Sequence, residues 1–109
     1  MSTLLLQANA TIIHCHSRTL HLSKLTCQAD LLVVAIGKKE FIDASYVKKG
    51  AIVVDVGINR NSEGQVVGDV AYQKVSPLCA AISPVPGGIG PMTIAMLMRN
   101  TIEAAEKTI

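Results

Sequence analysis

The sequence is poor in aromatic residues and contains no tryptophan. Phe41, Tyr46 and Tyr72 are the aromatic residues among 109, so the core must be built from aliphatic side chains. Half of the residues are hydrophobic, which suffices for one core, and the length fits a single domain. An aliphatic composition of this kind suits a parallel sheet covered by helices, because its strands are apolar on both faces.

The sequence also lacks an excess of one charge, a long hydrophobic run and paired cysteines. The formal net charge is +2 and the lysine pairs at 38–39 and 48–49 are isolated, so we expect no nucleic-acid surface. No run reaches the roughly 18 apolar residues of a membrane span, and the N-terminus does not resemble a signal peptide, so we expect no membrane partner. Cys15, Cys27 and Cys79 have no paired spacing and indicate free thiols in a reducing cytoplasm.

Short apolar runs of strand length recur along the chain. They cover residues 11–16, 31–36, 51–56 and 79–83. None of them alternates cleanly between apolar and polar residues, which is typical of strands buried on both faces. Helical stretches separate the runs, so the sequence predicts βαβ units with right-handed crossovers. The expected fold class is therefore α/β, a Rossmann-type, mainly parallel sheet with flanking helices.

Helices are expected before the first run, at residues 2–9, and after it, at residues 20–28. Asp43 is expected to cap a short helix that ends at Gly50, and Asp69 to cap another that reaches about Val75. Residues 59–69 contain a turn signal and predict a small hairpin or a long loop.

A final helix is the clearest prediction. Pro91 suits its first turn. Glu103 and Lys107 are spaced as a favourable i,i+4 pair. An apolar stripe at helical spacing follows from Ile94, Leu97, Met98, Ile102 and Ala105.

Ligands of parallel sheets bind beyond the carboxyl ends of the strands, so the residues after each run are the candidates for a site. After the first run, Ser17 and Arg18 offer a hydroxyl and a guanidinium, groups that suit the 2′-phosphate of NADP. A polar turn that caps the next helix is the alternative. His14 and His16 have no further paired ligands in the sequence, so we expect no metal site.

The second and third runs are each followed by a glycine, Gly37 and Gly57. Gly37 would let a cofactor ring approach the backbone, or simply form a turn. Asp55 lies inside an apolar run and needs hydrogen-bond partners, and we favour a structural role for it over a ligand contact.

The loop at residues 83–93 combines prolines and glycines ahead of the N-terminus of the last helix. Free N–H groups at such a terminus favour anionic or electron-rich groups. The alternative is an ordinary flexible linker, but such a linker does not combine rigid prolines with glycines at fixed positions in this way. There is no G-x-G-x-x-G motif and no P-loop, and the chain starts inside a predicted helix. We therefore expect the first strand and the phosphate loop of the Rossmann fold to be missing.

These segments, in this order, resemble the bifunctional methylenetetrahydrofolate dehydrogenase/cyclohydrolases. The resemblance covers essentially the whole chain and points to the family's C-terminal NADP-binding domain. It rests on Cys15-His16-Ser17-Arg18-Thr19, residues 30–37, residues 49–59, Val67-Gly68-Asp69-Val70 and, above all, residues 84–93.

The resemblance implies a cytoplasmic, usually homodimeric enzyme of one-carbon metabolism and purine biosynthesis. With NADP it oxidises 5,10-methylenetetrahydrofolate, and it hydrolyses the methenyl product to 10-formyltetrahydrofolate. It implies cofactor contacts at Ser17, Arg18, Ala35, Gly37, Gly57, Ile58 and Thr93. It implies a folate cleft lined by Pro86, Gly87, Gly88, Ile89 and Gly90.

The family's catalytic lysine, its tyrosine and its pterin-binding aspartate belong to an N-terminal domain that this sequence lacks. Met1 falls where the family has the methionine that follows its phosphate loop. We therefore expect a partial NAD(P)-binding domain over residues 1–109, with no catalytic residues and no activity alone. The resemblance also implies that the last helix packs against the absent domain, so part of its apolar stripe is expected to be exposed.

Two alternatives remain open from the sequence. The chain could be a non-catalytic nucleotide-binding or interaction module that pairs with the full-length enzyme. It could also belong to another NADP-dependent dehydrogenase, such as a shikimate-type enzyme, against which the loop at residues 84–93 argues.

Overall fold

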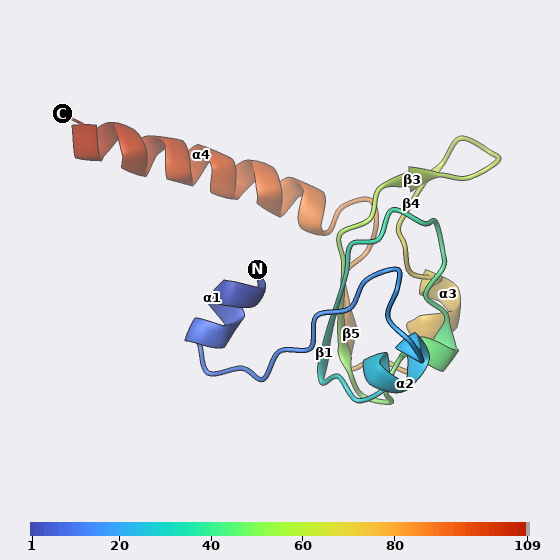
Figure 1. Cartoon of the computed structure of the whole chain (residues 1–109). Coiled ribbons are helices and arrows are strands. Elements are labelled where there is room, and N and C mark those ends of the chain that lie inside the picture. The colour runs from blue at the N-terminus through green and yellow to red at the C-terminus, as the bar shows by residue number, and fades with distance from the viewer. Residues whose placement is uncertain (109) are drawn as a thin grey trace.

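A three-stranded parallel sheet forms the centre of the molecule, as a computed structural model that describes residues 1–108 shows (Figure 1). Its strands are β1 (Leu31–Val34), β2 (Ile52–Asp55) and β5 (Ala81–Ile82), in the order β1-β2-β5. Both neighbouring pairs are parallel, which confirms the predicted Rossmann-type α/β sheet. The register aligns Val34 with Asp55 and Val53 with Ile82, so the carboxyl ends of all three strands lie at one edge of the sheet.

Three short helical segments accompany the sheet. They are α2 (Leu22–Thr26), the 3-10 helix η1 (Ala44–Tyr46) and α3 (Tyr72–Val75). Asp43 caps η1, as expected, because its Oδ1 accepts the N–H of Ser45 at 2.9 Å. The helix nevertheless ends at Tyr46 instead of continuing to Gly50.

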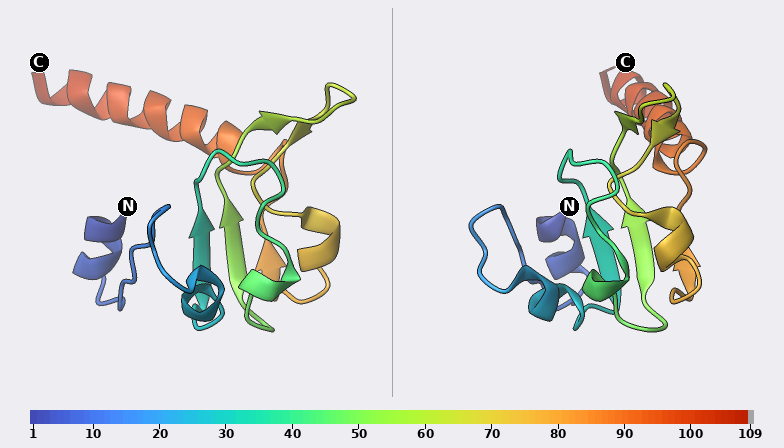
Figure 2. Two further views of the ribbon diagram at one scale, coloured as in Figure 1. Left: turned by 45° about the vertical axis from the view of Figure 1, so that its right-hand side comes forward. Right: turned by 90° about the vertical axis from the view of Figure 1, so that its right-hand side faces the viewer.

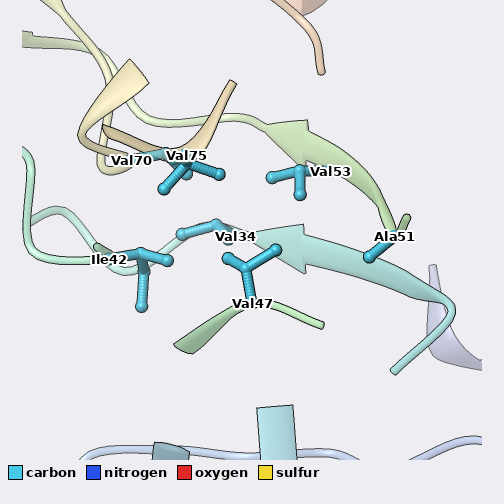
Figure 3. Packing of buried hydrophobic residues seen from close by; sticks show 7 residues of the cluster. All are labelled: Val34, Ile42, Val47, Ala51, Val53, Val70 and Val75. Carbon is cyan, nitrogen blue, oxygen red and sulfur yellow. The ribbon is translucent and has the colours of Figure 1, made fainter. Parts of the chain in front are cut away.

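The core is aliphatic, as the scarcity of aromatic residues predicted (Figure 3). Val53 of β2 and Val75 of α3 are its most buried side chains, at 1% and 0% exposure. Burial of each such side chain contributes about 1.5–3 kcal/mol. The buried cluster consists of Val34, Ile42, Val47, Ala51, Val53, Val70 and Val75.

A small hairpin leaves the carboxyl edge of the sheet. Its strands β3 (Asn59–Arg60) and β4 (Val66–Val67) are antiparallel, and Asn59 pairs with Val67 at its base. At the tip, Asn61 Oδ1 accepts the N–H groups of Glu63 at 3.0 Å and Gln65 at 2.9 Å. This turn confirms the predicted hairpin.

Two helices stand apart from the sheet. The short helix α1 (Ser2–Gln7) and the long helix α4 (Ile89–Thr108) lie to one side of the sheet in Figure 1 and in the left view of Figure 2. Pro91 lies in the first turn of α4, as predicted, but no residue of α4 is buried. Its predicted apolar stripe is exposed at Ile94, Leu97, Met98 and Ile102. Within the described residues, no helix is long and apolar enough to cross a membrane.

The expected strand at residues 11–16 does not form. Among residues 1–108, the backbone groups of residues 11–15 make no backbone hydrogen bond. A β-branched apolar run favours an extended chain, but a strand also requires a neighbour that completes its ladder. Because β1 is paired with β2 alone, residues 11–16 do not form a ladder on its other edge and remain outside the sheet.

Two side-chain predictions were also wrong. Asp69 does not cap α3, whose N-cap position is Ala71 without a side-chain hydrogen bond. Glu103 accepts a hydrogen bond from Arg99 Nε at 2.9 Å instead of pairing with Lys107. Arg99 and Lys107 each lie four residues from Glu103 on the same helix face, so the sequence spacing allows either pair.

Candidate functional site

A cavity of about 540 Å³ lies beyond the carboxyl ends of β2 and β5. Three segments form its walls: the loop after β2, the loop after β5 and the first two turns of α4. Val66 of the hairpin completes the lining. The walls are almost entirely apolar, and the full set of lining residues is Val56, Gly57, Ile58, Val66, Pro84, Val85, Pro86, Gly87, Gly88, Ile89, Gly90, Pro91, Thr93 and Ile94.

The structure brings most of the expected site residues to this one cavity. Gly57, Ile58 and Thr93 lie in its wall together with the predicted cleft residues Pro86, Gly87, Gly88, Ile89 and Gly90. Thr93 donates its hydroxyl to the carbonyl of Ile89 at 3.0 Å, one turn earlier in α4. The cavity therefore joins segments that are about 30 residues apart in the sequence at the edge where parallel sheets bind ligands.

Ser17 and Arg18 do not line the cavity. They form an exposed turn that is held by local hydrogen bonds to the side chains of its neighbours: the N–H of His16 donates to Thr19 Oγ1 at 2.8 Å, and the N–H of Arg18 donates to His16 Nδ1 at 3.2 Å. Within residues 1–108, neither the Ser17 hydroxyl nor the Arg18 guanidinium has a hydrogen-bond partner. The turn does not cap α2 either, whose N-cap His21 makes no side-chain bond.

Ala35 and Gly37 follow β1 and are also outside the cavity lining. Both are exposed, and Gly37 has a φ of 70°, in the region that favours glycine. A Cβ at residue 37 would meet no atom within 4 Å. The space beside this strand end is therefore open.

The family model for the tetrahydrofolate dehydrogenase/cyclohydrolase NAD(P)-binding domain matches residues 1–109. The chain belongs to this family. The alternative of a shikimate-type dehydrogenase is set aside, because the match covers every residue of the chain.

Curated relatives support the same assignment. The bifunctional protein FolD of Ligilactobacillus salivarius is 57% identical over 109 residues, which is 100% of this chain and 38% of the relative. The FolD protein of Streptococcus pneumoniae serotype 4 is 55% identical over the same shares. The chain thus spans less than two fifths of the length of the curated relatives it matches.

Solved structures of the family have the same fold. The FolD methylenetetrahydrofolate dehydrogenase/cyclohydrolase of Campylobacter jejuni is 51% identical, with a TM-score of 0.96 over 100% of this chain and 39% of its own. The Trypanosoma brucei enzyme, complexed with NADP cofactor and inhibitor, is 33% identical, with a TM-score of 0.88 over 98% of this chain and 39% of its own.

Asp55 is a buried structural carboxylate, as we favoured from the sequence. Asp55 is the last residue of β2 and is 3% exposed. Oδ1 accepts the N–H groups of Gly57 at 2.9 Å and Asp69 at 3.1 Å, and Oδ2 accepts that of Val70 at 3.0 Å. These donors satisfy the carboxylate from the protein backbone.

Asp69 is the residue of this region that sequence reasoning missed. It is 0% exposed, and its Oδ2 accepts the N–H groups of Ile36 at 2.8 Å and Gly37 at 3.0 Å. Its Oδ1 accepts Nδ2 of Asn59 at 2.7 Å. The signal in the sequence was an acidic residue inside the apolar run 66–71, because a buried carboxylate needs hydrogen-bond donors from some part of the chain.

The groups with shifted pKa values lie away from the cavity. Burial raises the pKa of the Cys79 thiol. The hydrogen bond and charge of Lys48 lower the pKa of Asp30, and the Ser45 hydroxyl and N–H lower that of Asp43. Among the described residues, no group of three His, Cys, Asp or Glu side chains is arranged to hold a metal ion. The cavity wall itself contains no acid or base.

Proposed function

We propose that this chain forms the NADP-binding part of an enzyme that oxidises 5,10-methylenetetrahydrofolate to methenyltetrahydrofolate and hydrolyses that product to 10-formyltetrahydrofolate. Family membership and the likeness to FolD structures support this function. The observation that carries it is the cavity at the strand ends, which Gly57, Ile58 and Thr93 line together with residues 86–90.

The cavity fits a flat, weakly polar ring system. We assign Gly57, Ile58 and Thr93 to the nicotinamide side, where NADP supplies the hydride acceptor. Pro86, Gly87, Gly88, Ile89 and Gly90 form the wall of the folate cleft. Apolar walls of this kind exclude water from a hydride transfer, and a loop stiffened by prolines holds the two rings in a fixed orientation.

The free groups of the Ser17–Arg18 turn suit the 2′-phosphate of NADP. The Ser17 hydroxyl and the Arg18 guanidinium have no competing partner within residues 1–108. A guanidinium binds a phosphate through two parallel hydrogen bonds, which favours NADP over NAD. Ala35 and Gly37, with open space beside them, are assigned to the cofactor between this turn and the cavity.

The chain alone is proposed to be inactive. Cyclohydrolysis and the oxidation step require groups that hold or move protons, and the cavity wall offers only aliphatic residues, glycines, prolines and Thr93. The catalytic groups would come from the remainder of a longer enzyme, since the relatives are more than twice as long. That enzyme is proposed to be a cytoplasmic homo-oligomer that acts on folate substrates in one-carbon metabolism and purine biosynthesis.

A chimera tests this function. Residues 1–109 replace the matching 38% of the L. salivarius protein, and NADPH formation from methylenetetrahydrofolate is measured for the chimera and for the chain alone. We expect turnover by the chimera and none by the chain. An inactive but folded chimera, or NADPH formation by the pure chain, would contradict the proposal.

A substitution of Arg18 tests the proposed contact with the 2′-phosphate of NADP. Arg18→Ala in the chimera should lower kcat/KM with NADP about tenfold or more, because one charge-assisted contact is lost, and should leave kcat/KM with NAD nearly unchanged. Lys24→Ala removes another exposed positive charge, on α2, and serves as the matched control. Equal losses with both cofactors would refute the assignment of the turn to the 2′-phosphate.

An interaction module is the second candidate function. The exposed apolar stripe of α4 favours it, since an apolar helix face of this length is uncommon on an isolated domain. Co-purification of tagged chain with a full-length FolD protein would support pairing. A chain that remains monomeric beside the full-length protein would exclude it.

A further inference from the structure

One buried side chain joins the two strand-end loops of the proposed cofactor site. Asp69 accepts the N–H groups of Ile36 and Gly37, directly after β1. Its second oxygen accepts the amide of Asn59, the first residue of β3. The loop after β1 and the base of the hairpin are thus tied together through the Asp69 carboxylate, which is 0% exposed.

The segment that leads to Ile58 is held on both sides by buried acids. Before it, the N–H of Gly57 bonds Asp55, and a Cβ on Gly57 would overlap the carboxylate of Asp69. After it, Asn59 bonds Asp69. Ile58 itself is 72% exposed although it lines the cavity, so little packing of its own fixes it. Its place depends on its neighbours and hence on Asp69.

We propose that Asp69 is a positioning residue for the cofactor: it sets the spacing between the backbone at residues 35–37 and the Ile58 wall of the cavity. The inference rests on the proposed function and adds to it a residue that touches neither ring. Because the N–H groups of Ile36 and Gly37 point to Asp69, they are not free to bind a ligand phosphate. The loop after β1 offers the cofactor only its small residues, Ala35 and Gly37.

Two substitutions separate geometry from charge. Asp69→Asn can keep one oxygen on Ile36 and Gly37, while its new NH₂ donates to Asn59 once the Asn59 amide rotates by half a turn. Asp69→Ala leaves three donors without an acceptor. In the chimera, we expect Asp69→Ala to raise KM for NADP about tenfold, because a displaced loop misaligns the cofactor. Asp69→Asn should remain within about threefold of the unchanged chimera.

The KM for the folate separates positioning from general damage. Residues 86–90 form the folate wall and make no hydrogen bond to Asp69. The KM for methylenetetrahydrofolate should therefore change less than the KM for NADP. Asp43→Ala is the matched control: this acid also accepts a backbone N–H, but it caps η1 outside the cavity lining. It should lower the Tm of the chimera without moving the KM for NADP.

The outcomes distinguish the two proposals. An unchanged chimera that is folded but does not use NADP overturns the proposed function, and this inference with it. An active chimera in which Asp69→Ala lowers only the Tm, as Asp43→Ala does, overturns the positioning role alone. If Asp69→Ala does not fold, Asn59→Ala removes one of the three bonds, and an unchanged KM for NADP in that variant overturns the role as well.

Discussion

The carboxylate of Asp55 occupies the space directly in front of Gly68, so that a Cβ on residue 68 would overlap it. Asp55 ends β2, and Gly68 follows β4. The same carboxylate accepts the N–H groups of the two residues after Gly68. This close approach, and not conformational freedom, requires a glycine, and it fixes the hairpin base on the end of the sheet.

Gly68→Ala should therefore destabilise the chain. The added methyl group must push the Asp55 carboxylate away from its backbone donors, and overpacking of this kind costs about 1–3 kcal/mol. The free energy of unfolding in urea, followed by circular dichroism, measures the loss.

Gly90→Ala is the control for that experiment. A Cβ at residue 90 would meet no atom within 4 Å, and the residue does not have a positive φ. Its stability should stay equal or rise slightly, since alanine is the better helix former. Equal stability of the two variants would show that the space between Asp55 and Gly68 is not filled.

The same Gly90→Ala change tests the folate wall. Gly90 lies in the cavity wall, and nothing in the chain's own packing requires a glycine there. In the chimera, a methyl group at this wall should obstruct the ligand and lower kcat/KM for methylenetetrahydrofolate about tenfold. Unchanged turnover would mean that no ligand approaches Gly90, and the assignment of residues 86–90 would need revision.

The sequence predicted the parts of the fold that depend on local patterns. The apolar runs became β1, β2 and β5, and Pro91 with its periodic stripe became α4. Residues 11–16 have an equally good run but form no strand. Strand formation requires a partner ladder, and no local pattern reports whether a partner is present.

The residues of the candidate site also differ in whether local sequence patterns could indicate them. The strand-end rule and the family resemblance together proposed Gly57, Ile58 and residues 86–90, and the structure places these residues around one cavity. The role of Asp69 could not be found in this way, because two of its donors are 32 and 33 residues away in the sequence. A short acidic side chain after a turn predicts a helix cap by local rules, and the tertiary structure places it elsewhere.

Asp43 should make stability depend on pH on the acid side. The Ser45 hydroxyl and then its backbone N–H hold the pKa of Asp43 below its ordinary value of 3.8. A lowered pKa in the folded state adds stability that is complete above the unfolded value and is lost as the pH falls through the folded one. Asp43→Asn should therefore lose less stability than the unchanged chain between about pH 5 and pH 3.

Urea unfolding at those two pH values measures the effect. Ser45→Ala, which removes the hydroxyl, should shift the pH dependence in the same direction. Parallel curves for the unchanged chain and both variants would show that Asp43 is not stabilised as an ion by Ser45.

The amides of helix α4 should be poorly protected against hydrogen exchange, despite the length of the helix. It has 20 residues and none of them is buried, so its stability comes from the helix itself. Helices without tertiary packing are only marginally stable in water, and their amides should be protected about tenfold or less. The amides of β2, which is paired on both sides, should be protected up to the free energy of global unfolding.

In the chimera, the protection of the α4 amides should increase about a hundredfold if Ile94, Leu97 and Met98 pack against the rest of the enzyme. Strong protection in the chain alone would instead mean that two copies cover this face, which favours the interaction module over the isolated domain.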